Sequence, residues 1–293
     1  MWKIDNSPSE MSKRLLSLYP ISVIKKEYEQ KGSLEDVHKH IVKKHITDDI
    51  HEDCLRLFGH TKQHVYFYNH KHNNISALNE HSFFNAQNCV KKNVIKKSSN
   101  LFEAEYLLSL GYHFLEVNGR TVDKRELKFL WPIRIIVTSK FLQLRIVIME
   151  SRMRSFNNYY FQVRDTDEDT IVRSVLNVLS GARSDWPLDL NRGIKHFWNK
   201  DFIDAKRVAH KSSKSMDNSS MDSGMTYKKE YPKRFSNSIS NPLTGKSVFS
   251  VLKEDGWPAK FTIDPSRGFL GFPTFQMEID AVNSFVEELL KCN

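Results

Sequence analysis

The strongest constraint on the fold is a stretch of alternating side chains at residues 141–151, FLQLRIVIMES. One side of this stretch is aliphatic and carries Leu142, Leu144, Ile146 and Ile148. The other side carries Gln143, Arg145 and Val147. A period of two residues is typical of a β-strand with one face in a core. The stretch therefore predicts a strand of a sheet whose two faces differ.

Further strands are predicted before and after this stretch. Asn118 and Gly119 form the preferred dipeptide of a tight hairpin, and extended sequence flanks them at 112–137. QHVYFYNHK at 63–71 and the segment 157–165 are rich in β-branched and aromatic residues. A helix is expected at 166–181. Strands joined by short turns and followed by a helix predict an antiparallel sheet with a helix on one face.

The stretches between these strands are harder to assign. We expect residues 101–111, LFEAEYLLSLG, to form a short helix that ends at a glycine. The basic segment at 75–100 reads as irregular. The Ser-rich segment at 211–226 is poor in core residues and predicts a mobile loop.

The two ends of the chain complete an α+β fold. Residues 9–58 have helical spacing, with Ser33 and Thr47 as candidate N-caps. A hairpin with a turn at 265–268 precedes a terminal helix. The apolar stripe expected on that helix consists of Ile279, Val282, Phe285, Val286 and Leu289. We therefore expect a small helical module at 1–60, followed at 61–293 by a mainly antiparallel sheet domain with flanking helices.

Composition narrows the classes of partner. The 293 residues carry a net charge of +9, which favours an anionic partner such as nucleic acid or an anionic membrane surface. The alternative is charge that serves only solubility. The three cysteines are widely spaced and form no CxxC pair, which favours a reducing, cytoplasmic location. The most apolar stretch, at 129–149, is interrupted by Pro132, Arg134, Lys140 and Arg145, so no membrane span is expected.

Histidines crowd the first third of the chain: nine of the 12 lie at residues 38–81, four of them at 60–72. Zinc sites need four ligands, usually in closely spaced pairs with cysteine common among them. His51 and Cys54 lie one helical turn apart, but no finger or ribbon spacing is present. The crowding is also what a composition rich in Lys, Asn, His and Ile produces. We therefore expect no metal and no other cofactor.

A strand at 64–68 presents a second possibility for this region. Alternation places Val65 and Phe67 on one face, as a natural core pair. His64, Tyr66 and Tyr68 then share the other face. These three side chains are candidates for stacking on nucleic-acid bases, and packing beneath the helical region is the alternative.

Two basic stretches provide candidate contacts to a phosphate backbone. The first holds Lys91, Lys92, Lys96 and Lys97. The second combines Arg152 and Arg154 with the stacking candidates Tyr159 and Tyr160. Basic and aromatic side chains interleaved in this way are typical of surfaces that bind nucleic acid. The alternative is a set of exposed charges on separate faces.

Catalytic motifs are weak by comparison. Glu126 and Lys128 form an ExK tripeptide, and Glu116 could supply a second carboxylate for the Mg²⁺ of a nuclease. This tripeptide is common in any Lys-rich chain. There is no GxSxG motif, and NPLTGKS at 241–247 lacks the first glycine of a phosphate-binding loop.

These patterns favour a non-catalytic subunit or adaptor that binds nucleic acid, DNA rather than RNA, beside a protein partner. A bacterial host-defence complex is one setting in which such a subunit works. Two alternatives stay open. One is a metal-dependent nuclease or phosphoesterase that uses Glu116, Glu126 and Lys128 or the histidines at 60–72. The other is a subunit that contacts only proteins.

Overall fold

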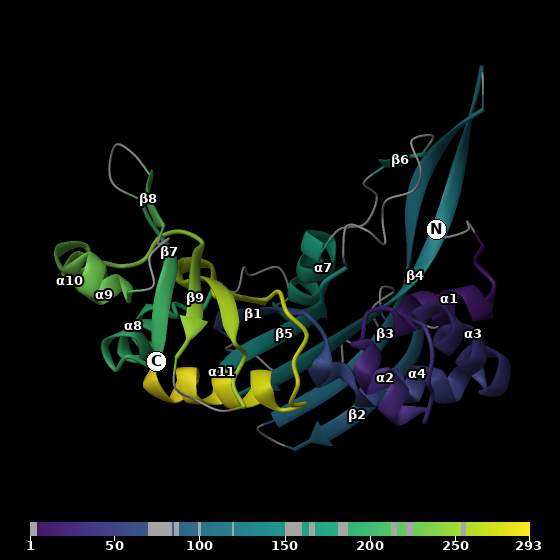
Figure 1. Ribbon diagram of the computed structural model, residues 1–293, viewed down its shortest axis with the longest axis horizontal. Helices are drawn as coiled ribbons and strands as arrows, with labels where there is room; N and C mark the ends of the chain where they lie inside the picture. The colour runs from purple at the N-terminus through teal and green to yellow at the C-terminus, as the bar shows by residue number, and fades with distance from the viewer. Residues whose placement is uncertain are drawn as a thin grey trace.

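The computed structural model describes residues 5–69, 84, 88–98, 101–118, 120–149, 160–163, 168–180, 187–211, 216–220, 225–252 and 256–293. Within these ranges the chain has the expected α+β fold, in which N-terminal helices precede a large antiparallel sheet (Figure 1). Eleven strands of the described part form one continuous sheet.

The sheet does not follow the order of the chain. Its strand order is β2-β3-β4-β5-β1-β11-β10-β9-β7-β8, and β6 pairs with the far end of β3. The first strand in sequence therefore lies in the middle, between β5 and β11. The strands are β1 (Gln63–Asn69), β2 (Cys89–Lys97), β3 (Leu101–Asn118), β4 (Thr121–Thr138), β5 (Phe141–Val147), β6 (Tyr160–Val163), β7 (Ile203–Lys211), β8 (Met216–Ser220), β9 (Ser247–Val251), β10 (Lys260–Asp264) and β11 (Phe269–Phe272).

Helices fall into an N-terminal group and a set that follows the first strands. The helices are α1 (Pro8–Leu16), α2 (Ile21–Glu27), α3 (Leu34–Lys44), α4 (Thr47–Arg56), α7 (Glu168–Ser180), α8 (Asn191–Asn199), α9 (Tyr227–Glu230), α10 (Pro232–Ser240) and α11 (Ala281–Cys292), with 3₁₀ turns η1 (Phe58–His60) and η3 (Pro265–Arg267). Ser33 is an N-cap as predicted, because its hydroxyl accepts from the Asp36 amide. The prediction for Thr47 was wrong, since Ile46 precedes α4 and no side chain caps it.

Two predicted elements were also wrong in type. Residues 101–111 belong to the long strand β3, and the segment expected to be irregular contains β2. The reason is the tertiary setting: Phe102, Ala104 and Tyr106 alternate with more polar neighbours, and β2 and β4 supply hydrogen bonds on both sides. Helix propensity is a weak preference that such pairing overrides.

Other elements agree with the sequence. The hairpin around Asn118, the strand at 141–147, β6, α7 and the β10–β11 hairpin are all confirmed. On α11, four residues of the predicted stripe are buried, whereas Ile279 lies before the helix and is exposed. Met216–Ser220, inside the predicted mobile loop, pairs with β7 as strand β8.

Gly268 fixes the β10–β11 turn. Its φ of 58° lies in the left-handed region, which favours glycine. A Cβ atom there would lie 2.3 Å from the Phe67 carbonyl oxygen, in a place where the Gly268 carbonyl accepts from the Phe67 amide at 2.7 Å. The glycine thus allows the hairpin to approach β1 closely.

The two faces of the sheet carry different layers. The face that bears Val65 and Phe67, here called the lower face, is covered by the N-terminal helices at one end and by α8 and α11 at the other (Figure 1). The face that bears His64 and Tyr66, here called the upper face, carries α7. Among the described helices, none is long and apolar enough to cross a membrane.

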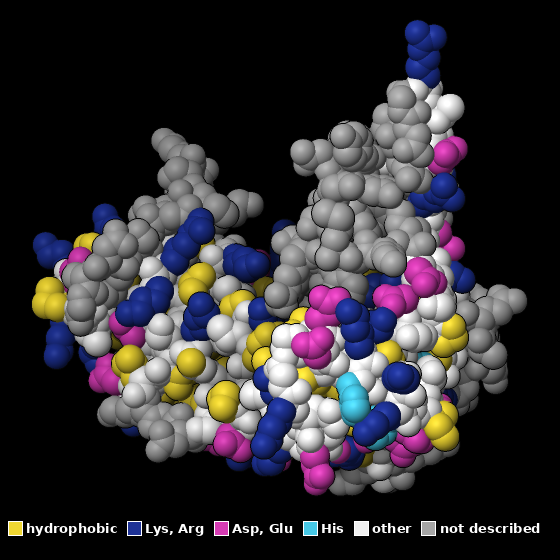
Figure 2. Space-filling model, turned by 45° about the vertical axis from the view of Figure 1, so that its right-hand side comes forward, with side chains coloured by type: hydrophobic (Ala, Val, Ile, Leu, Met, Phe, Trp, Pro, Cys, Tyr) yellow, Lys and Arg dark blue, Asp and Glu magenta, His cyan; other side chains and the backbone are white. Residues whose placement is uncertain are grey.

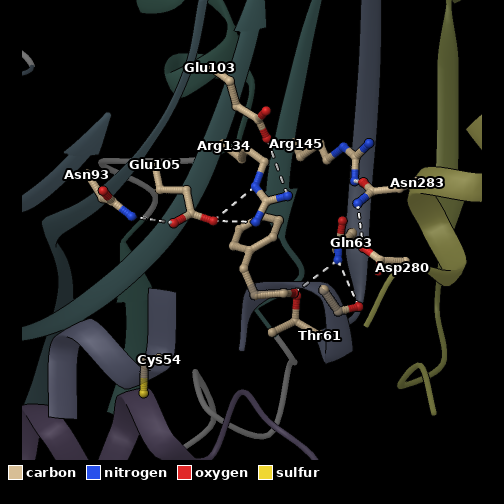
Figure 3. A network of polar contacts seen from close by, with 12 residues as sticks. Cys54, Thr61, Gln63, Asn93, Glu103, Glu105, Arg134, Arg145, Asp280 and Asn283 are labelled. Atoms are coloured by element: carbon tan, nitrogen blue, oxygen red, sulfur yellow. Dashed lines mark hydrogen bonds and ion pairs between the residues drawn. The ribbon is translucent and has the colours of Figure 1, made fainter. Parts of the chain in front are cut away.

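A polar network lies on the lower face between the two groups of helices (Figure 3). Arg134 forms an ion pair with the buried Glu105, and the Glu105 carboxylate also accepts from the Asn93 side-chain amide. The Arg134 guanidinium lies 3.6 Å from the Glu103 carboxylate. Arg145 donates to Asn283 of α11 at 2.5 Å. Burial and the nearby Arg134 lower the pKa of Arg145 to about 9. Through Arg145 and Asn283, the network connects the middle strands of the sheet to α11 by polar contacts.

Candidate nucleic-acid interface

The upper face is open over β9 and β10. On β10, Phe261 and Ile263 point to the lower face and are fully buried, while Lys260 is exposed and Thr262 half-buried. On β9, Phe249 is fully buried, whereas Val248 and Ser250 are half-buried. Because register pairs Val248 with Thr262 and Ser250 with Lys260, these partly exposed residues share one side of the sheet. The described helices therefore leave the upper face uncovered here.

Four exposed cations surround this open region, which we call the open face. They are Lys206 and Arg207 on β7, Lys246 just before β9, and Lys260 on β10. Register places Arg207 next to Val248. Lys206 is the extra residue of a β-bulge, and its Nζ lies 3.9 Å from the buried carboxylate of Asp204. Figure 2 shows Lys and Arg side chains spread over the C-terminal half of the molecule.

An aromatic cluster forms the inner border of the open face. The centroid of the Phe269 ring lies 5.1 Å from that of His64 and 5.2 Å from that of Tyr66. The Lys246 ammonium lies over the Phe269 ring, 5.3 Å from its centroid. Phe269 pairs in register with Tyr66 on one side and Asp264 on the other. The cluster thus lies where the open face meets the part of the sheet beneath α7.

Glu168, the first residue of α7, fixes this border. Its carboxylate lies 2.7 Å from His64 Nδ1 and accepts from the Tyr66 hydroxyl at 2.8 Å. Burial, and next the Glu168 carboxylate, raise the pKa of Tyr66 well above its ordinary value. The predicted polar-aromatic face of β1 therefore lies against the beginning of α7, beside the open face.

Tyr68 lies deeper than its two neighbours on β1. It is only 8% exposed and belongs to the core that includes α7. Burial, with a smaller effect from Asp169, raises its pKa to about 12. Of the three residues predicted on this face, His64 and Tyr66 reach the border of the open face, and Tyr68 packs in the interior.

The β2 lysines lie far from this region. Lys91 bridges to helix α4 through Asp48 at 2.9 Å and Glu52 at 3.1 Å. Lys92 is exposed and lies 5.5 Å from the centroid of the Tyr106 ring. Seven strand steps separate β2 from β9, about 34 Å at the usual spacing. The side chains of Lys96 and Lys97 lie outside what the structure describes.

Most residues of the second basic stretch cannot be placed. Arg152, Arg154 and Tyr159 lie outside the described residues. The backbone of Tyr160 begins β6, opposite Glu116 of β3, and its side chain is not described.

The residues considered for a metal site do not lie opposite each other in the β3–β4 hairpin, and the side chain of Glu116 is not described. Glu126 pairs in register with His113, whereas Glu116 pairs with Asp123, three positions further along the hairpin. An odd number of positions places the two residues on opposite faces of a ribbon. His60 is directed to the Gln276 carbonyl, away from His64 and its partner Glu168. No group of three metal-ligating side chains occurs in the described part of the chain.

A polar cavity of about 600 Å³ lies on the lower face, away from the open face. It is lined by Asp49, Glu52, Asp53, Arg56, Asn93, Ile95, Glu105 and Arg134. Most of these charges already have protein partners: Arg56 pairs with Asp53, and Arg134 with Glu105. Burial raises the pKa of Glu105. The first pair lies within α4 and the second within the sheet, so both arginines of the lining are already engaged by carboxylates of the protein.

Sequence reasoning missed the residues of the open face. The alternation of KFTID at 260–264 places Lys260 and Thr262 opposite Phe261 and Ile263, so this signal was present in the sequence. Lys206, Arg207 and Lys246 were isolated charges until the register of β7, β9 and β10 brought them together. Phe269 is buried like the core aromatics around it, and no signal in the sequence indicates that its ring borders the open face.

Comparison with known proteins adds no identification. No protein-family model matches the sequence, and a search of curated proteins found no similar sequence.

Proposed function

We propose that the protein binds nucleic acid, with the phosphate backbone held on the open face of the sheet. The observation that carries this proposal is the exposure pattern of β9 and β10. None of the described helices covers their upper side, which is bordered by Lys206, Arg207, Lys246 and Lys260. Covering this side with a helix would have buried more apolar surface. The sequence instead places polar and cationic residues on it.

Electrostatics supports an extended polyanion as the ligand. Phosphate contacts by Lys and Arg release counterions, and this release supplies much of the affinity of proteins for nucleic acid. The net charge of +9 adds long-range attraction. Asp204 and Asp264 also lie near the cations, but Asp204 is buried and accepts from the Tyr227 amide. The exposed charge of the open face is therefore mainly positive.

The open face is a different region of the sheet from the β2 lysines that the sequence predicted as phosphate contacts. Lys91 is engaged by two carboxylates of α4, so its charge is partly neutralised within the protein. The separation from the open face means that both groups cannot contact the same few nucleotides. Substitutions in the two groups therefore have different expected outcomes.

The test is a binding titration with fluorescently labelled DNA and RNA at several salt concentrations. One variant changes Lys206, Arg207, Lys246 and Lys260 to Gln. A second changes Lys91, Lys92, Lys96 and Lys97 to Gln. A matched control removes the same charge from exposed lysines of the N-terminal region, at Lys26, Lys31, Lys43 and Lys44.

The open-face variant is expected to bind at least about tenfold more weakly than the unmodified protein. The slope of log affinity against log salt should flatten by about 0.7 to 0.9 for each phosphate that the variant no longer neutralises. The β2 variant and the control should change affinity by less than about threefold through net charge alone. Equal decreases in all three variants would show that binding depends on diffuse charge. Absence of binding to DNA and RNA at low salt would refute the proposal.

A further inference from the structure

The width of the open face limits what it can hold. Four strand steps separate β1 from β7, which amounts to about 19 Å at the usual strand spacing. On the β1 side, α7 stands on the sheet through Glu168, and a helix with its side chains is about 10 Å across. On the other side the β7–β8 hairpin rises from the sheet in the same direction (Figure 1). With half of the helix width taken from the β1 side, the opening that remains is about 14 Å or less.

A duplex does not fit easily into such an opening. Its major groove alone is about 12 Å wide, and the two backbones lie outside that groove. A single strand presents one backbone and unpaired bases, so it can lie flat on a sheet. We infer that the open face, if it binds nucleic acid as proposed above, takes a single strand in preference to a duplex.

Charge determines how the strand would lie. The four cations lie on or beside β7, β9 and β10, whereas Glu168 lies at the opposite border, above β1. A phosphate backbone is therefore attracted toward β7 and repelled from α7. The bases then point toward β11 and β1, where the Phe269 ring lies with His64 and Tyr66.

Phe269 is the candidate stacking platform; it is 9% exposed, so a base reaches its ring only after the side chain that covers it moves away. In the structure the Lys246 ammonium lies over its ring, 5.3 Å from the centroid. At exposed sites a cation over an aromatic ring contributes about two- to fivefold to an equilibrium. Stacking of a base on an aromatic side chain contributes about five- to 150-fold. A base can therefore displace the Lys246 side chain, which then becomes available to a phosphate.

Polar side chains between the cations and the ring suit the sugar and the base edges. Thr262 and Ser250 lie on the upper side of β10 and β9, and both are half-buried. The Thr262 hydroxyl donates to the Gly271 carbonyl at 3.3 Å and keeps its lone pairs for a ligand donor. Contacts of this kind tolerate many sequences, so weak sequence preference is expected.

The experiment compares one labelled 15-nucleotide strand with the duplex formed from it and its complement, in DNA and in RNA. Variants are Phe269→Leu, Phe269→Tyr and a control, Phe141→Leu. Phe141 is a half-buried phenylalanine of β5 that contacts Phe67 on the lower face. Circular dichroism and thermal melting check that each variant folds.

The single strand is expected to bind at least about tenfold more tightly than the duplex. Phe269→Leu should weaken single-strand binding at least about fivefold and leave duplex binding unchanged, and Phe269→Tyr should keep the affinity because stacking persists. Phe141→Leu should have no effect. Equal or tighter duplex binding, or an unchanged affinity in Phe269→Leu, would overturn the inference and leave the proposed function standing. If neither form binds, the proposed function itself fails. If Phe269→Leu does not fold, the Phe269→Tyr result and the strand preference decide.

Discussion

Beneath α7 the upper face of the sheet is an apolar interior, and beyond β1 the same face is a polar surface. Ile135 of β4 and Leu144 of β5 are fully buried in one core with Ile171 and Val175 of α7. Across β1, on the strands beyond it, the equivalent positions carry half-buried Val248 and Thr262 beside exposed lysines. The sheet is continuous across both regions. The difference shows that strands can stay in a sheet with one side exposed where a core on their other side stabilises them.

The lower face provides that support at the C-terminal end. Phe249, Phe261 and Phe272 lie there in a second core with residues of α8 and α11. The rings of Phe261 and Phe285 lie 4.7 Å apart, and Trp257 and Trp198 extend the aromatic contacts. This core supports the lower side of β9 and β10, while Val248, Ser250, Lys260 and Thr262 on the upper side of the same strands stay partly or fully exposed.

The largest expected effect contrasts the two regions directly. Leu144→Ala opens a cavity beneath α7 and should lower the free energy of unfolding by about 3 kcal/mol. Val248→Ala removes half-exposed methyl groups from the open face and should cost less than about 1 kcal/mol. Urea denaturation measures both. Similar decreases would mean that the open face is covered in solution.

Acid should affect the N-terminal end selectively. Burial, and next the charge of Lys13, lower the pKa of His38 to about 4. Because the unfolded value is about 6.5, the stability that neutral His38 provides is complete above that pH and is lost as the pH falls toward 4. Between pH 7 and pH 5 this decrease is about 2 kcal/mol.

His38→Leu removes this titrating group, so its unfolding free energy should fall less over the same pH interval. Comparison with the unmodified protein is necessary because Glu105 acts in the opposite direction: burial raises its pKa, so protonation favours the folded state. An unchanged pH dependence in His38→Leu would show that His38 does not contribute.

A smaller effect tests the border between the two regions. Tyr66→Phe removes the hydroxyl that donates to Glu168 and should cost about 1 kcal/mol. Glu168→Ala in the same background should show that the two effects are not additive, because both changes remove the same hydrogen bond. Additive effects would show that the Tyr66 hydroxyl stabilises the fold through a contact other than the one with Glu168.

The smallest expected change in stability belongs to the proposed binding residues. Changing Lys206, Arg207, Lys246 and Lys260 to Gln should alter the unfolding free energy by less than about 0.5 kcal/mol, since exposed charges contribute little. Thermal melting of the variant measures this. A large decrease in stability would assign these cations a structural role and would contradict the description of the open face as an exposed surface.

Periodicity and turn residues carried the prediction of the fold, and the limits of that prediction have physical causes. The alternation at 141–147 and the Asn118 hairpin act over short distances, so the sequence shows them directly. Residues 101–111 appeared helical because their own preferences compete with pairing to β2 and β4, which lie elsewhere in the chain. Strands and hairpins can be predicted in this way, but their neighbours cannot, and Gln143 and Arg145 on the predicted polar side of the strand at 141–147 are buried as well.

The candidate site was harder to predict for the same reason. Arg207, Lys246 and Lys260 are far apart in the sequence and meet only because β7, β9 and β10 are neighbours. The lysines of β2 formed a more conspicuous run in the sequence, yet Lys91 is held by acidic residues of α4. A run of lysines in the sequence shows only that the segment is basic. Whether basic residues form one surface depends on which strands are neighbours in the sheet.

The central position of β1 has a consequence for the synthesis of the chain. Its partners are β5, which emerges from the ribosome soon after it, and β11, which emerges near the end. Val65 and Phe67 belong to the core of α8 and α11, and Tyr68 belongs to the core of α7. Until β11 has been synthesised, one edge of β1 has no strand to pair with. A nascent chain of this topology therefore keeps an unpaired strand edge for longer than a protein whose sheet grows outward from its first strand.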